Sequence, residues 1–215
     1  MKPLTAAEQA AIARLPAVES GLKQEFGIGR SEGGEGLTAS TMRPALNIRG
    51  LRSGQVGAEA ASAIPVDATV SIDLRLVPGQ TPQRVRAKVE AFLASKGWTV
   101  VSGAPDLATR LAHPRVIRLA WGGGYPALRS DMTSPAAKGV IAAAEDAAGG
   151  PVTLLPMMGA SVPINLFDEQ FHVPVIGLPI TNHDNNQHAA NENLRLRNLW
   201  DAVTLYAAMM AKLTW

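Results

Sequence analysis

Cysteine is absent from this sequence, which excludes thiol nucleophiles, disulfide bonds and cysteine-ligated zinc. Aromatic residues make up only 5% and charged residues only 18% of the 215 positions, yet hydrophobic residues reach 47%, so we expect a sizeable core. No apolar run approaches the roughly 18 residues of a membrane span, and Glu8 and Arg14 interrupt the start where a signal peptide would be apolar. The lack of a membrane span and of a signal peptide predicts a soluble, cytoplasmic protein without a membrane partner.

An excess of positive charge is also missing. The chain has 20 Lys and Arg against 18 Asp and Glu, and it contains no run of basic residues. Nucleic-acid-binding proteins depend on a concentrated positive field, so nucleic acid is not expected as a partner.

The first part of the chain, residues 1–37, is predicted to be a short helix followed by a linker. Residues 5–15 are alanine-rich, and Thr5 with Glu8 three positions later has the spacing of a capping box. Residues 27–36 carry five glycines without apolar periodicity, which indicates a loop.

A second block, residues 38–129, is predicted to be a small α+β sandwich. Its strand-like segments are 44–51, 67–78, 98–101 and 115–121. Thr81 followed by Pro82 is a helix-start signature, and that helix should end near Gly97. A sheet with helices on one face accommodates this order of elements.

The last block, residues 130–215, looks like part of an α/β layer structure. Ser134 caps an alanine-rich helix that ends at Gly149 or Gly150. The dense apolar runs 152–156 and 172–179 are typical of strands buried on both faces. A closing helix should bury one stripe, formed by Leu199, Val203, Tyr206 and Met210.

Four histidines are the first candidates for chemistry. His113 precedes a proline and His172 begins a predicted strand, so both are interpreted as structural. His183 and His188 fall in "TNHDNNQHAANENL", between a predicted strand and the closing helix, where α/β proteins gather ligand-binding loops. Metal ligands are frequent in this segment: His183, Asp184, His188 and Glu192. Equally open is a plain polar loop in which Asn191 or Asn193 caps the helix.

The sequence around His188 resembles a known family. "NNQHAANENLRLRNLWDAV" is similar to the C-terminal signature of the zinc metallopeptidases that include carnosinases, aminoacylases, acetylornithine deacetylase and succinyl-diaminopimelate desuccinylase. Three further segments resemble the same family in the same order: "ASAIP" (61–65), "SIDLRLVPGQTPQRV" (71–85) and "MGASVPI" (158–164). The resemblance covers about residues 38–215 and implies a lid or dimerisation domain at 38–129, followed by the end of a catalytic domain.

Specific roles are implied by this resemblance. His188 would bind one zinc of a two-metal site, and Arg75 would meet the substrate's carboxylate with its guanidinium fork. The same carboxylate would contact Ser161, the backbone amides of Gly159 and Ala160, and the hydroxyl of Ser62. The implied substrate is a dipeptide or N-acyl amino acid, cleaved at an amide bond by metal-activated water.

Differences from the family matter as much. Ser134 stands where carnosinase-like members have a histidine, Ala160 replaces their second glycine, and the chain has no His-x-Asp, Glu-Glu or His-Ser-Gly motif. We therefore expect the C-terminal portion of such an enzyme, inactive alone. The fold class should be α/β, a small α+β lid-type sandwich followed by an incomplete catalytic layer.

Association is the expected consequence of an incomplete sheet, because exposed edges invite pairing into a homodimer or higher assembly. An alternative is a noncatalytic dimerising or carboxylate-binding module that retains the lid. A nucleotide site at "WGGGY" (121–125) is disfavoured, because no strand, glycine fingerprint and helix follow in order.

Overall fold

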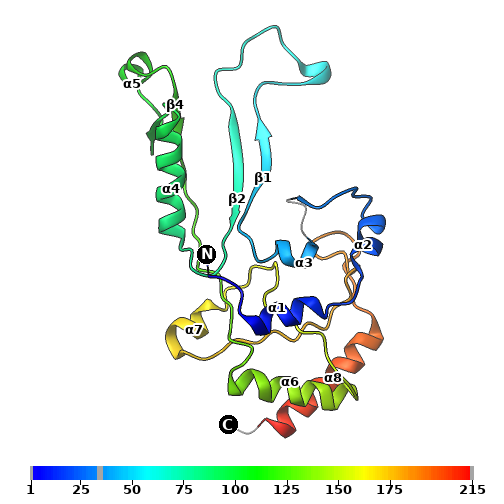
Figure 1. Cartoon of the computed structure of the whole chain (residues 1–215). Helices are drawn as coiled ribbons and strands as arrows, with labels where there is room; N and C mark the ends of the chain where they lie inside the picture. Colours follow the sequence, from blue (N-terminus) through cyan, green and yellow to red (C-terminus); the bar gives the residue numbers. More distant parts are fainter. Residues whose placement is uncertain (1, 33–35, 214–215) are drawn as a thin grey trace. The chain divides into compact units, whose positions relative to one another are not determined.

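The computed structural model describes residues 2–32 and 36–213, and the chain divides into two compact units. The first unit comprises Ser40–Leu128 with the N-terminal Lys2, and the second comprises Pro3–Ala39 with the chain from Arg129 onward. Both units mix helices with extended segments, which confirms the α/β class (Figure 1). Within the described residues, no helix combines the length and apolarity needed to cross a membrane.

A two-stranded antiparallel ribbon is the most extended part of the first unit. Strand β1 (Ala45–Arg52) pairs with β2 (Thr69–Arg75), so that Leu46 lies opposite Leu74 and Ile48 opposite Ile72. The register shifts between Ile48 and Gly50, leaving Arg49 as an extra residue. Because side chains alternate along a strand, this bulge returns Leu51 to the apolar face opposite Val70.

Beyond the ribbon, the first unit continues through a helix and a second small sheet. The segment between β1 and β2 contains the 3-10 turn η2 (Gly57–Glu59). Helix α4 (Pro82–Ser95) begins at Thr81, whose hydroxyl accepts from the Arg84 amide, and it packs against β3 (Thr99–Val101). Strand β3 pairs in parallel with β4 (Val116–Arg118), and α5 (Leu107–Ala112) lies between them in sequence. The predicted cap and all four predicted strand positions of this block are confirmed.

The second unit is mainly helical. Its longest helices, α6 (Pro135–Ala148) and α8 (Leu196–Lys212), pack against each other around the buried Ala143, Ala144 and Met209. Three short helices complete it: α1 (Ala6–Ala13), α2 (Glu19–Glu25) and α7 (Asn165–Phe171). A further short helix, α3 (Leu37–Ser40), lies where the chain passes from the second unit to the first.

The start signals of α1 and α6 were predicted correctly. Thr5 and Glu8 form the expected capping box of α1, and Ser134 accepts from the Ala137 amide at the start of α6. Gly149 ends α6 in the left-handed conformation that glycine adopts without strain. The predicted glycine-rich loop is without helix or strand at residues 27–31, and its residues 33–35 lie outside the described part of the chain.

Two predicted strands are wrong. Residues 152–156 and 172–179 form no strand, and most of their positions are exposed or only partly buried. An apolar run has extended propensity, but a strand also needs a partner for its backbone groups. At Val175 that partner is a side chain: Ser130 Oγ accepts from the Val175 amide at 3.0 Å and donates to its carbonyl at 2.8 Å. His172 likewise does not begin a strand; it ends α7 with a φ of 54°.

The buried face of α8 also differs from the prediction. Met210, placed in the buried stripe, is 87% exposed, whereas Ala202 and Met209 are buried and Leu205 packs beside them. Helix α8 is apolar on much of its circumference, so periodicity alone does not choose a face. The small side chains of α6 make that choice, because they allow Met209 to approach Ala143 and Ala144.

Candidate functional site

Arg75 is the last residue of β2 and lies on the polar face of the ribbon. Its guanidinium Nε is 2.5 Å from the carboxylate of Asp73, which lies two residues earlier on the same face. Arg75 also lines a cavity of about 230 Å³, whose other walls include Pro44, Leu76 and Gln80. Nearly half of the Arg75 side chain is exposed, so a carboxylate from solution can reach it.

Ser62 is not brought to the same point as Arg75 within one copy of the chain. Arg75 lies opposite Ala45 at one end of the ribbon, whereas Ser62 belongs to the segment that continues beyond the Arg52–Thr69 end (Figure 1). At about 3.3 Å per residue, the length of β2 alone separates these ends by roughly 20 Å. One copy therefore cannot offer both side chains to a single carboxylate.

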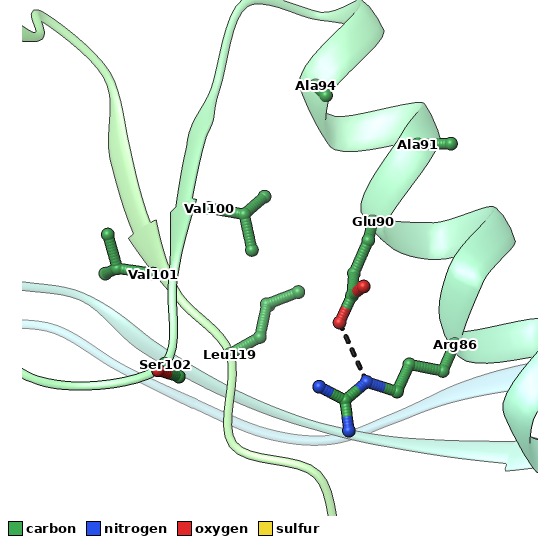
Figure 2. Close-up of a pocket in the computed structure, with 8 residues that line it drawn as sticks. All are labelled: Arg86, Glu90, Ala91, Ala94, Val100, Val101, Ser102 and Leu119. Atoms are coloured by element: carbon green, nitrogen blue, oxygen red, sulfur yellow. Dashed lines mark hydrogen bonds and ion pairs between the residues drawn. The ribbon is translucent and has the colours of Figure 1, made fainter.

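Another cavity of the first unit contains none of the predicted site residues. It has a volume of about 490 Å³ and lies between α4 and β3 (Figure 2). Its wall is apolar at Ala91, Ala94 and Val100, and Arg86 Nε is paired with Glu90 at 2.9 Å on its rim. Trp121 Nε1 donates to the same carboxylate at 3.0 Å, so Glu90 already has two partners.

Gly159, Ala160 and Ser161 lie in an exposed segment without helix or strand. This segment precedes α7, which begins after Ile164 without a side-chain cap. The sequence analysis predicts that backbone amides of this segment bind an anion. The roles assigned to these three residues stay predictions.

His188 lies on a turn-rich loop, residues 182–195, between the apolar run that ends near Pro179 and helix α8. Its side chain is exposed, its φ is 64°, and its backbone amide donates to Glu192 at 3.4 Å. Asn186 and Asn191 also have positive φ, at 54° and 61°. The loop thus has three non-glycine residues in the left-handed conformation within six positions. This backbone conformation is costly and must be stabilised by other contacts.

Asn182 supplies that support from the buried side of the loop. It is only 6% exposed, and its Nδ2 donates to Asp184 at 2.8 Å and to Asn193 at 3.2 Å. Its Oδ1 accepts from the Arg195 amide at 3.1 Å. Neither Asn191 nor Asn193 caps α8, which begins after Arg195 without a side-chain cap, so the plain capping interpretation is wrong.

Asp184 gains the clearest electrostatic stabilisation in this loop. The hydrogen bond from Asn182, followed by the charges of Arg195 and His183, holds the pKa of the Asp184 carboxyl below its usual 3.8. Arg195 Nη2 lies 2.5 Å from Asp184 Oδ2, and His183 Nε2 lies 3.2 Å from a Glu25 carboxylate oxygen. The sequence analysis named Asp184 and His183 as candidate metal ligands, and the structure pairs them with Arg195 and Glu25. It missed Asn182, because nothing in a polar run indicates which amide is buried.

These residues do not compose a complete metal centre. Among residues 2–32 and 36–213, no group of three or more His, Asp or Glu side chains is placed to hold a metal ion. Zinc in proteins takes three or four protein ligands, and His188 alone does not meet that requirement. The described residues therefore do not fit the two-metal site that the resemblance implies.

A family model and three solved structures of longer chains resemble this chain. Residues 8–98 match the family model of the peptidase dimerisation domain, M20_dimer. Over 98% of its length the chain superimposes on 46% of an M20 family metallo-carboxypeptidase from Sulfolobus solfataricus, with a TM-score of 0.76 and 23% identity. It covers 42% of the di-peptidase Dug1p from Saccharomyces cerevisiae, using 96% of its own length (TM-score 0.69, 20% identity). Human carnosine dipeptidase 1 is matched over 43% of its length and 98% of this chain (TM-score 0.72, 18% identity).

The chain thus spans less than half the length of each of these structures. At such identities the likeness establishes the fold. The shared fold agrees with the resemblance found in the sequence. It does not establish the activity of a whole enzyme for this chain.

Proposed function

We propose that this chain, whose residues 8–98 match the family model of the peptidase dimerisation domain, acts as the dimerising and substrate-carboxylate-binding portion of an M20 metallopeptidase. The proposed reaction of the whole enzyme is cleavage of an amide bond beside a free carboxylate, in a dipeptide or N-acyl amino acid. The observation that carries the proposal is the match of residues 8–98 to the peptidase dimerisation domain.

Arg75 supports the substrate part of this proposal. A guanidinium recognises a carboxylate through two parallel hydrogen bonds, and Arg75 stands at the rim of a cavity with its side chain half-exposed. Ser62 lies at the opposite end of the ribbon, so we propose that it serves the site of another copy. Ser161 and the amides of Gly159 and Ala160 are proposed as further contacts to the carboxylate.

Zinc is proposed only for the whole enzyme. His188 is its expected ligand here, and the other ligands and the general base have no counterpart among the described residues of this chain. No catalytic step is therefore assigned to these residues.

Self-association is proposed to use the apolar face of the β1–β2 ribbon. This face consists of three cross-strand pairs, Leu46–Leu74, Ile48–Ile72 and Leu51–Val70. Leu51 is 74% and Ile48 68% exposed, although both belong to a sheet face that would ordinarily be covered. The proposed occupant is a second copy, because this ribbon lies inside the segment that matches a dimerisation domain.

The test is sedimentation equilibrium of the 215-residue protein and two variants of β2. Burying an isoleucine contributes about 1.5–3 kcal/mol, and about 1.4 kcal/mol is a tenfold change in affinity. Ile72→Glu should therefore weaken self-association at least tenfold.

Ser71→Glu is the matched control, because it adds the same charge at the adjacent residue, which faces the opposite side of the ribbon. It should leave the association constant within threefold of wild type. A monomeric wild-type protein, or equal effects of both substitutions, would contradict the proposal.

A further inference from the structure

Asn182 is a buried, uncharged polar residue of the second unit, only 6% exposed. A buried amide must use its hydrogen-bonding groups, because burying them unpaired costs about 1–3 kcal/mol. Asn182 uses both ends of its amide, with two donated bonds and one accepted bond. Its orientation is thus set by the network, since an amide turned by 180° would place a donor against the Arg195 amide.

The partners of Asn182 come from both ends of the loop. Asp184 lies two residues after it, whereas Asn193 and Arg195 lie eleven and thirteen residues after it. One buried side chain therefore closes the segment 182–195 into a ring. A second bond, from the Asn193 amide to the Asn185 carbonyl at 2.9 Å, runs across the same ring.

His188 lies near the middle of this ring. A left-handed conformation costs roughly 1–2 kcal/mol per residue that is not glycine, and such residues persist where the surrounding structure holds them. With the ring closed, the three left-handed residues 186, 188 and 191 are confined together. With the ring open, each residue is free to return to the more stable right-handed or extended backbone.

We propose that Asn182 is a positioning residue that closes the 182–195 loop and thereby fixes the direction in which the His188 imidazole points. The inference rests on the proposed function only for the role of His188 as a metal ligand. The structural claim about the loop stands on hydrogen bonds and burial.

The experiment uses the 215-residue protein with Asn182→Ala and Asn182→Asp. Alanine removes all three bonds, and aspartate keeps the shape but cannot donate to Asp184 or Asn193. Backbone amide hydrogen exchange should become at least tenfold faster across residues 185–194 in both variants, with α6 and α8 unchanged. In protein labelled with ¹⁵N-histidine, the His188 imidazole signals should shift toward those of an unstructured peptide, while those of His113 stay in place.

Asn165→Ala is the control, because Asn165 is a partly exposed asparagine of the same unit whose Nδ2 also bonds a carboxylate, that of Glu169 at 3.1 Å. It should leave both measurements unchanged. Wild-type exchange and an unmoved His188 signal in both Asn182 variants would overturn the proposal. So would acceleration spread evenly over α6 and α8, since that marks general destabilisation.

Failure of the proposed function would look different. If His188→Ala left zinc binding and activity of a complete enzyme unchanged, the metal-ligand role would be lost. The loop measurements need no metal and would keep their outcome.

Discussion

Glu8 and Arg129 form a buried ion pair in the second unit, with 3.1 Å between Arg129 Nε and Glu8 Oε1 and both side chains almost fully covered. Glu8 also accepts from the Thr5 amide at 2.7 Å, and Arg129 donates to the Pro3 carbonyl at 2.9 Å. These bonds connect helix α1 to Arg129, the residue at which the chain returns to the second unit after Leu128. A carboxylate recognised in the sequence as half of a capping box thus has a second role that only the fold reveals.

Removing one partner of this pair should destabilise the second unit strongly. Glu8→Ala removes the carboxylate that pairs with the buried Arg129 guanidinium, and removing one partner of a buried ion pair costs about 3–5 kcal/mol. Urea unfolding followed by circular dichroism measures the loss. Arg197→Ala is the control, because its pair with Asp201 is highly exposed and should contribute no more than about 0.5 kcal/mol. Equal stabilities of the two variants would disprove the importance of burial.

Asp184 predicts a pH dependence of the 182–195 loop. Its pKa in the folded protein is lowered from 3.8, first by the bond from Asn182 and then by the charges of Arg195 and His183. A carboxyl group whose pKa is lower in the folded than in the unfolded chain stabilises the fold at pH values above its unfolded pKa. This stabilisation is lost as the pH falls through the pKa of the folded state. The change in the amide signals of residues 185–194 that Asp184 causes should therefore have its midpoint below pH 3.8. In Asp184→Asn this acid-dependent step should disappear, and its persistence would assign the step to another group.

At the scale of elements, α6 shows how a stop signal works. Gly149 ends this helix with a φ of 69°, and a Cβ added there would meet no atom within 4 Å. Gly150 has equal space around it without a positive φ. Substituting each of these two glycines in turn therefore distinguishes the effect of backbone strain from that of steric overlap.

Gly149→Ala should lower the free energy of unfolding by about 1–2 kcal/mol, because an L-residue is strained in the left-handed region. Gly150→Ala should change it by less than about 0.5 kcal/mol, as an open surface site does. Thermal unfolding of both variants in parallel provides the comparison. A larger loss at Gly150 would mean that this glycine has a packing role.

For the whole molecule, the proposal predicts an inactive chain. The described residues contain no cluster of three metal ligands, and two-metal hydrolysis requires several carboxylates and histidines around paired ions. Purified 215-residue protein supplied with zinc should therefore hydrolyse dipeptides and N-acyl amino acids no faster than zinc alone, as followed by release of the free amino acid. Robust hydrolysis that is lost in His188→Ala would show that the chain assembles a catalytic centre on its own.

Helix ends, strand faces and family motifs could be predicted from the sequence because they depend on residues close together along the chain. Thr5, Thr81 and Ser134 begin helices and Gly149 ends one, because capping depends on residues three or four positions apart. The alternation of β2 predicted which of its side chains share the polar face, and Arg75 lies there beside Asp73. The family resemblance also came from short contiguous motifs, of which His188 and Arg75 are the most specific.

Contacts between distant segments decided the rest. The runs 152–156 and 172–179 are apolar enough for strands, yet strands form only where a partner lies alongside, and Val175 is instead bonded to Ser130. Helix α8 turns Met209 inward and Met210 outward because of the small residues of α6. The burial of Asn182 and the pairing of Glu8 with Arg129 are likewise invisible to periodicity, since each depends on residues brought together by folding from well beyond one helical turn.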